Sequence, residues 1–182
     1  MGPQKKSRSI TEKDKKITAY HESGHALLHK LLPNCDEVQE VSIIPRGMAG
    51  GYTMSRPDND ENYASYNKLN NMIASMMGGR IAEEIIFGDI STGASNDLER
   101  ATVLLDKMLS TYGLVDGSLI VKSALNNNVI GNSVSDDYIK ELDSIANSIK
   151  AEVVELFNTI EVRNELIDLT EELLDKEVVY YN

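Results

Sequence analysis

The residues at positions 19–28 read AYHESGHALL and contain the pattern H-E-x-x-H. On a helix, side chains four residues apart lie on the same face, so His21 and His25 can bind one cation together. Glu22 lies one step round the helix, where it can contact a water molecule on the metal without binding the metal itself. A catalytic zinc ion needs three protein ligands and an open position. The pentapeptide therefore supplies two of the three ligands and a candidate general base.

The alternative is a helix that carries two ordinary histidines. The chain has three histidines, and two of them fall in this one pentapeptide. The third, His29, lies about 12 Å of helix rise from His21, too far to share one small ion, and we expect it at the rim or in solvent. The longer H-E-x-x-H-x-x-G-x-x-H pattern is absent, because Leu28 and Leu31 stand where it needs glycine and histidine. The third ligand must then be a distant carboxylate.

Three carboxylates are candidates for that ligand: Glu83 and Glu84 in GGRIAEEIIFG, and Asp97 in STGASNDLERAT. Helix electrostatics favour Asp97, because the first turn of a predicted helix keeps a carboxylate ionised. Glu83 and Glu84 lie within a helix, and Glu84 can pair with Arg80 one turn earlier. They are alternative ligands, partners that orient a histidine, or structural ion pairs. The residues alone leave these alternatives open.

Short elements surround the motif. The spacing of apolar residues predicts a helix from Thr11 that ends at Pro33. The β-branched segment 38–44 predicts a strand, and residues 52–54 a second one. Within VSIIPRG, Ser42, Ile43 and Ile44 are candidates to bind an extended peptide along a sheet edge; an ordinary strand explains them equally well.

The rest of the chain reads as helical. Residues 63–87 predict a helix in which Gly78-Gly79 would allow another backbone to pack closely. Ser95-Asn96 can cap a helix that runs to about residue 112, and everything from residue 135 onward is expected to be helical. An interruption near residues 158–161 predicts an antiparallel helix pair. The fold class is therefore mainly α (α+β), with a small β-sheet or hairpin and a C-terminal antiparallel helix pair.

We expect residues 1–9 to be a disordered arm or linker and residues 10–182 to form one domain. That domain divides into a motif-bearing part (10–113), a loop region (114–134) and C-terminal helices (135–182). The net charge is −11 over 182 residues, which disfavours nucleic acid as a partner. One cysteine, Cys35, excludes an internal disulfide and a thiolate zinc site. No run approaches the roughly 18 to 20 apolar residues that span a bilayer, so we expect this chain to be soluble.

Three blocks of the chain, ITEKDKKITAYHESGHALL, VSIIPRGMAGGYT and GGRIAEEIIFGDISTGASNDLERAT, resemble the peptidase domain of the FtsH-type AAA+ zinc metalloproteases in order and spacing. The resemblance covers residues 10–113, and a weaker helical match continues to about residue 178. It implies a zincin-type metalloendopeptidase with one Zn2+ per chain and Asp97 as the third ligand. Glu83 and Glu84 would then lie near the site but not on the metal.

The resemblance also implies partners. Such a domain would hydrolyse unfolded polypeptides fed to it by the AAA+ ATPase module of its parent protein, in protein quality control. The parent would be a membrane-anchored homo-hexamer with this domain on the cytoplasmic side. The chain lacks the phosphate-binding pattern G-x-x-x-x-G-K-[ST], so we expect no ATP bound by this chain. A non-catalytic assembly platform and a small-molecule metallohydrolase are the competing classes.

Overall fold

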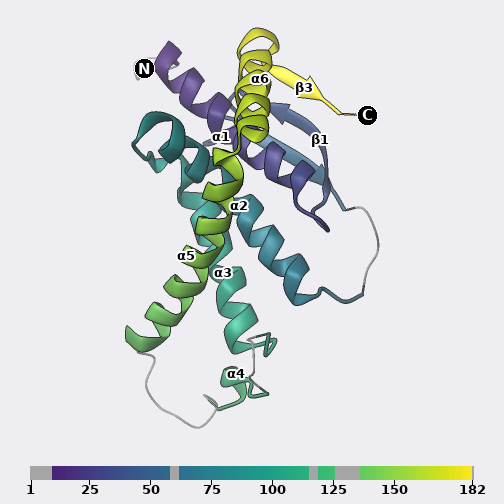
Figure 1. Ribbon diagram of the computed structural model, residues 1–182, viewed down its shortest axis with the longest axis vertical. Helices are drawn as coiled ribbons and strands as arrows, with labels where there is room; N and C mark the ends of the chain where they lie inside the picture. Colours follow the sequence, from purple (N-terminus) through teal and green to yellow (C-terminus); the bar gives the residue numbers. More distant parts are fainter. Residues whose placement is uncertain (1–9, 58–61, 115–118, 126–135, 182) are drawn as a thin grey trace, which may run out of the picture.

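The computed structural model describes residues 10–57, 62–114, 119–125 and 136–181. In these ranges the chain is mainly helical, with a small three-stranded antiparallel sheet that lies in the upper part of Figure 1. The predicted mainly α (α+β) class with a small β-sheet is thereby confirmed. The expected arm at 1–9 lies outside the described residues. The loop region 114–134 is described only in part, and that part contains the short helix α4 (Lys122–Leu125).

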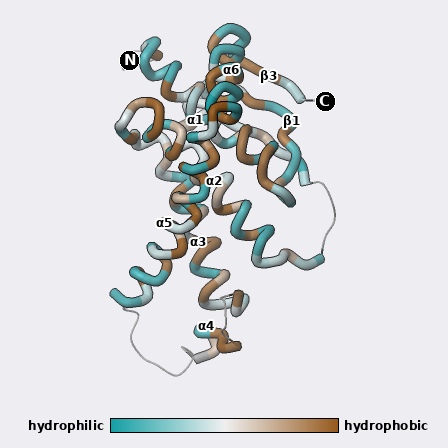
Figure 2. Tube along the Cα trace, in the orientation of Figure 1, coloured by the Kyte–Doolittle hydropathy of each residue, from teal (hydrophilic) through white to brown (hydrophobic). Residues whose placement is uncertain are grey.

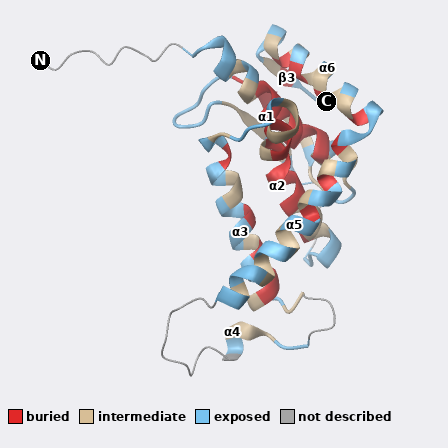
Figure 3. Ribbon diagram, turned by 60° about the vertical axis from the view of Figure 1, so that its left-hand side comes forward, coloured by how far each residue is buried: buried red, intermediate tan, exposed pale blue. Residues whose placement is uncertain are grey.

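The central helix is α1 (Glu12–Leu31), which carries the H-E-x-x-H motif. It begins where the Thr11 hydroxyl accepts a hydrogen bond from the Asp14 amide at 3.1 Å. It ends at Leu32, which is extended, as expected of a residue before proline. Every residue from 19 to 28 is buried, so the helix is covered on all sides along this stretch (Figure 3).

Helix α2 (Tyr66–Phe87) crosses α1 at unusually close range. A Cβ atom on Gly24 of α1 would lie 2.5 Å from the Gly78 carbonyl oxygen, and one on Gly78 would lie 2.8 Å from the Gly24 oxygen. Real Cβ atoms do not come so close, so both positions require glycine. The prediction that Gly78-Gly79 admits another backbone is confirmed.

The sheet has the strand order β2-β1-β3. The predicted strands appear as β1 (Glu37–Ser42) and β2 (Tyr52–Arg56), while β3 (Val178–Tyr180) occupies residues that were expected to be helical. That expectation is wrong because Glu177 adopts a left-handed conformation (φ 64°), which ends the preceding helix. Since Val41 pairs with both neighbouring strands, β1 is the central strand of the sheet.

Two helices precede β3, namely α5 (Asp136–Asn158) and α6 (Ile160–Lys176). They follow one another in Figure 1, with α5 packed on α2 and α6 packed on α1. The predicted interruption is therefore correct, but the predicted antiparallel pair is wrong. Only Thr159 separates the two helices, and antiparallel helix hairpins use a loop of about two to five residues.

Helix α3 (Ser95–Ser110) follows the 3-10 turn η1 (Thr92–Ala94). Ser95 and the next residue lie inside α3 rather than capping it, and the Ser91 hydroxyl caps η1 instead, by accepting from the Gly93 amide. Apolar and polar segments alternate along α3 and α5, as expected of helices that bury one face (Figure 2). None of the helices in the described ranges is both long enough and apolar enough to cross a membrane.

Candidate metal centre

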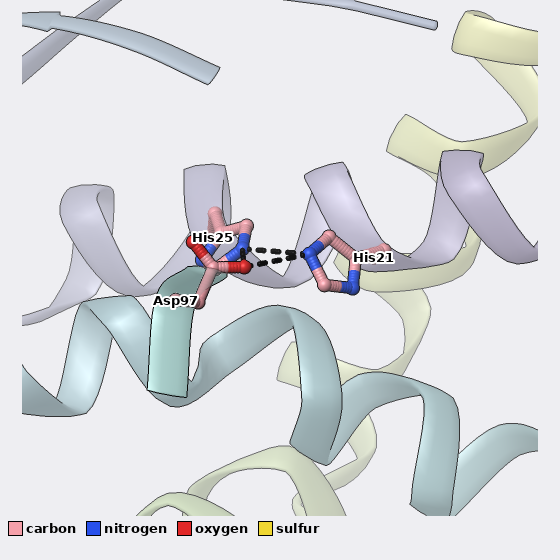
Figure 4. Close-up of side chains that lie close together, drawn as sticks. All are labelled: His21, His25 and Asp97. Atoms are coloured by element: carbon pink, nitrogen blue, oxygen red, sulfur yellow. Dashed lines mark hydrogen bonds and ion pairs between the residues drawn. The ribbon is translucent and has the colours of Figure 1, made fainter. Parts of the chain in front are cut away.

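Helix α1 presents His21 and His25 on its buried face toward the start of α3. The Nε2 atoms of the two imidazoles lie 3.0 Å apart. The Oδ2 atom of Asp97 lies 3.0 Å from Nε2 of His21 and 3.1 Å from Nε2 of His25 (Figure 4). Asp97 lies 76 residues after His21 and 72 residues after His25, yet its Oδ2 and the two Nε2 atoms form a nearly equilateral triangle.

Asp97 reaches the two histidines because the chain turns sharply between α2 and α3. Gly88 is left-handed (φ 66°) and closes α2 through a bond from its amide to the Glu84 carbonyl oxygen. The η1 turn then directs the start of α3 toward α1, with Asp97 in its first helical turn. The free amide groups and the dipole at this helix end favour an ionised carboxylate, as the sequence predicted.

Each imidazole is oriented by a partner on its Nδ1 atom. Nδ1 of His21 lies 2.6 Å from Oε1 of Glu83, and Nδ1 of His25 lies 2.7 Å from the Ser75 carbonyl oxygen. An imidazole that donates through Nδ1 keeps its lone pair on Nε2. Both partners come from α2, so this helix turns the two Nε2 lone pairs toward the same point.

Gly79 explains why α2 can lie so close to His21. A Cβ atom at this position would come within 2.5 Å of Nε2 and 2.6 Å of Cδ2 of His21. The His21 ring therefore occupies the space where any other residue would place its side chain. The second glycine of the pair makes room for a candidate metal ligand, whereas Gly78 makes room for backbone.

The charges of the site depend on one another. Burial lowers the pKa of His21, but hydrogen bonds to Asp97 and Glu83 outweigh burial and raise it to about 10. Burial also opposes the ionised form of Asp97, yet its bonds to His21 and His25 hold the pKa of its carboxyl well below the usual range. Glu83 is likewise lowered in pKa, because bonds from His21 and Ser91 exceed the effect of its burial. The cluster thus strongly favours positive charge at its centre.

The donor set fits a zinc ion. Zinc bonds to histidine and carboxylate are about 2.0–2.2 Å long, and tetrahedral geometry then places the ligand atoms about 3.3 Å from one another. The three atoms here are 3.0–3.1 Å apart, so an ion needs only a slight spreading of the triangle. Two imidazoles and one carboxylate are also a ligand set known in catalytic zinc sites. Within the described ranges, no other group of three potential ligands converges in this way.

Glu22 lies beside this triangle without joining it. Its side chain is buried, with 7% of the residue exposed, and Oε2 accepts a 2.8 Å hydrogen bond from the Thr53 hydroxyl of β2. Burial raises the pKa of Glu22, although the neighbouring His25, His21 and Thr53 counteract part of this effect. A buried carboxylate of raised basicity next to a metal site is suited to general-base chemistry.

The remaining candidates lie elsewhere. Glu84 is not part of the triangle; its carboxylate pairs with Lys150 of α5 at 2.8 Å and not with Arg80 as expected. His29 is half-buried, and its Nδ1 lies 2.9 Å from the Asp36 carbonyl oxygen, outside the metal group, as predicted.

The edge expected at Ser42–Ile44 is not formed. Ser42 pairs with both Tyr52 and Val178, and the Ile43 amide donates to the Glu177 carbonyl oxygen at 3.0 Å. The physical reason is β3, which covers the side of β1 that the sequence left open. The outer edge next to Glu22 belongs to β2 instead.

Sequence reasoning missed two groups at the site. The Ser75 carbonyl gave no signal, because every residue has one. Thr53 had a weak signal, because it lies in the GGYT segment at the start of the second predicted strand. Pairing that strand with the first one, which packs on α1, would have placed Thr53 near Glu22. Two histidines one turn apart, a carboxylate from a second helix and an adjacent glutamate define a candidate zinc hydrolase centre.

Known proteins agree with this class. Residues 8–182 match peptidase family M41. The chain is 55% identical over 113 residues to the ATP-dependent zinc metalloprotease FtsH 1 of Thermoanaerobacter sp., which covers 62% of this chain and 18% of that protein. It is 40% identical over 190 aligned positions to FtsH 4 of Synechocystis sp. and 41% over 189 to FtsH of Ruminiclostridium cellulolyticum, each covering 98% of this chain and 30% of the relative.

The chain therefore belongs to peptidase family M41 and corresponds to the peptidase domain of FtsH-type zinc metalloproteases. The family is the one that the sequence motifs predicted. It spans less than a third of the length of these relatives.

Proposed function

We propose that this chain is a zinc-dependent endopeptidase domain in which His21, His25 and Asp97 hold one zinc ion and Glu22 is the general base. The observation that carries the proposal is the triangle of Nε2, Nε2 and Oδ2 atoms with sides of 3.0–3.1 Å. The name of the relatives as zinc metalloproteases supports zinc over other divalent ions.

His21, His25 and Asp97 would hold the zinc ion, and the bound ion would supply Lewis acidity to lower the pKa of water and polarise a peptide carbonyl. Glu22 takes the proton from the attacking water on its carboxylate and later gives it to the leaving amine. With zinc bound at the two Nε2 atoms, Glu83 and the Ser75 carbonyl would accept the Nδ1–H of His21 and His25 and so fix the orientation of both imidazoles. The half-buried Asp97 keeps its negative charge beside both histidines.

The substrate is an extended, unfolded segment of polypeptide that pairs with the outer edge of β2. In the strand order β2-β1-β3, this edge has no partner among the described strands. Thr53 of the same strand contacts Glu22, so a chain added to β2 would run past the general base. Main-chain pairing reads few side chains, which suits broad sequence tolerance.

The parent protein supplies the other partners. The relatives are named ATP-dependent, and we propose that an AAA+ ATPase module delivers unfolded polypeptides to this domain. A membrane-anchored homo-hexamer with the domain on the cytoplasmic side, active in protein quality control, is the assembly that fits this supply. ATP is used by that module and not by the residues of this chain.

Cleavage of an unstructured fluorogenic peptide tests the proposal. We expect activity that a chelator removes and added zinc restores, with one zinc per chain by elemental analysis. Asp97→Ala should abolish both zinc binding and cleavage, whereas His29→Gln, a histidine outside the triangle, should retain both. Full zinc content in the Asp97→Ala protein would refute the ligand set.

A further inference from the structure

The contact between Thr53 and Glu22 links the sheet to the general base. Oγ1 of Thr53 lies 2.8 Å from Oε2 of Glu22 and 3.2 Å from the Glu22 carbonyl oxygen. A threonine hydroxyl has one proton to donate, and the shorter contact is to the carboxylate. Hydrogen bonds to an ionised group are shorter and about twice as strong as those between neutral groups.

The start of β2 confines the Glu22 side chain as well. A Cβ atom on Gly51 would lie 3.0 Å from Cγ of Glu22, 2.8 Å from Cγ2 of Thr18 and 2.6 Å from the Ser42 carbonyl oxygen. Gly51 thus lets the strand lie directly against the aliphatic part of Glu22. Two residues later, the Thr53 hydroxyl meets the carboxylate at the end of the same side chain.

We propose that Thr53 is a positioning residue that fixes the carboxylate of Glu22 in one orientation for proton transfer. Among the described residues, Thr53 is the hydrogen-bond partner that the structure gives to this carboxylate. The hydroxyl neither gains nor loses a proton over the cycle: the proton passes from water to Glu22 and then to the leaving amine. The inference rests on the proposed function, because it assigns a role in the reaction of that site.

This arrangement joins two tasks in one strand. The outer edge of β2 is the proposed substrate edge, and the inward side chain of Thr53 holds the base. Misplacement of a catalytic group by roughly 1 Å can reduce a rate on the order of 100-fold. A flexible Glu22 would spend part of its time in unproductive rotamers, so loss of the hydroxyl should lower kcat rather than weaken substrate binding.

The test compares Thr53→Val with Thr53→Ser. Valine keeps the branched shape and removes the hydroxyl, while serine keeps the hydroxyl. We expect the valine variant to lose about tenfold or more in kcat on the unstructured peptide, with KM within about twofold and zinc content unchanged. The serine variant should retain kcat within about threefold. Thr111→Val, at an exposed threonine at the far end of α3, controls for the substitution itself.

A second readout needs neither turnover nor metal. In metal-free protein labelled with 13C at the glutamate carboxyl carbon, the Glu22 signal can be assigned by its loss in Glu22→Gln. One sharp signal is expected in the unsubstituted and Thr53→Ser proteins, and a shifted or broadened signal in Thr53→Val. An identical Glu22 signal in all three would overturn the positioning role.

The other outcomes are equally decisive. If Thr53→Val retains kcat, or Thr53→Ser falls as far as valine, the hydroxyl has no positioning role. If the valine variant loses zinc, Thr53→Ala replaces it, and zinc loss in both makes Thr53 structural and overturns the inference. Failure of the proposed function looks different: the unsubstituted protein shows no zinc-dependent cleavage, or Glu22→Gln retains it.

Discussion

Gly79→Ala should damage the metal centre even though alanine is the better helix former. Within a helix, alanine is favoured over glycine by about 1 kcal/mol, so helix propensity alone predicts a more stable protein. The structure predicts a collision, because the new Cβ would lie 2.5 Å from Nε2 of His21. Ordinary contacts begin near 3.4 Å, so the ring must retreat by about 0.9 Å. Overpacking of this kind costs about 1–3 kcal/mol.

The two effects leave a net loss of stability of about 0–2 kcal/mol, whereas the loss of metal binding has nothing to offset it. Functional groups must be held within about 0.5 Å of their productive position, and the required shift exceeds this limit. It also pulls His21 away from Glu83, whose bond to Nδ1 is 2.6 Å long. Loss of such an orienting partner alone reduces metal affinity 10- to 100-fold. We therefore expect zinc affinity to fall on the order of 100-fold, or about 2.7 kcal/mol.

Competition with a chromophoric chelator measures this affinity, and thermal unfolding of the metal-free protein measures stability separately. Gly50→Ala is the control, since a Cβ there meets only the Thr18 side chain, at 3.3 Å or more. Zinc affinity of Gly79→Ala within threefold of the unsubstituted protein would refute the reasoning. A large loss of stability in the metal-free Gly79→Ala protein, with zinc affinity retained, would also refute it, because the strain would then lie in the backbone and not at His21.

Other perturbations separate the roles of the acidic groups. Glu22→Gln should retain zinc and lose at least about 100-fold in kcat, because general-base catalysis contributes about 10²- to 10⁴-fold; a fully active variant would contradict its role. Asp97→Ala should lower zinc affinity by more than about 100-fold. Glu84→Ala removes only a partly exposed ion pair with Lys150, so it should leave zinc affinity unchanged and cost about 0–1 kcal/mol of stability. If metal analysis gave the reverse order, Glu84 and not Asp97 would be the third ligand. Burial raises the pKa of the Cys35 thiol to about 11 from a reference of 9.0, so its thiolate fraction near pH 8 is about 100-fold lower than that of an exposed thiol. The rate of Cys35 alkylation should therefore rise with pH up to about pH 11. Rapid alkylation of the native protein at pH 8 would contradict this.

Local patterns in the sequence were sufficient for the helices and for two ligands. His21 and His25 follow from helical spacing alone, and Pro33 and Gly88 mark helix ends through backbone conformations that any fold would respect. Gly78-Gly79 signalled a close approach correctly. The spacing could not identify which element approaches, because Gly24 lies more than fifty residues away and the contact exists only after folding.

Tertiary arrangement decided what the sequence could not. The segment from residue 178 to 180 continues an apolar helical pattern, and it becomes a strand because β1 offers an open edge to it. That event makes β1 central and leaves β2 as the edge beside Glu22. Glu83 and Glu84 are adjacent and chemically equivalent in the sequence. Their positions on α2 differ by one helical step, so one faces His21 and the other faces Lys150.

The glycine pair in α2 connects the fold to the chemistry. Two glycines within a helix cost about 2 kcal/mol of helix propensity relative to alanine, and helices normally pack with axes 8–10 Å apart. At such a separation a layer of side chains would lie between α1 and α2. The Ser75 carbonyl oxygen belongs to the α2 backbone, and it could not then lie 2.7 Å from Nδ1 of His25. A backbone carbonyl oxygen has no flexible side chain with which to bridge a wider gap. The close crossing of α1 and α2 is therefore required for the Ser75 carbonyl to orient His25. The unfavourable propensity of the pair is therefore a condition for the metal centre.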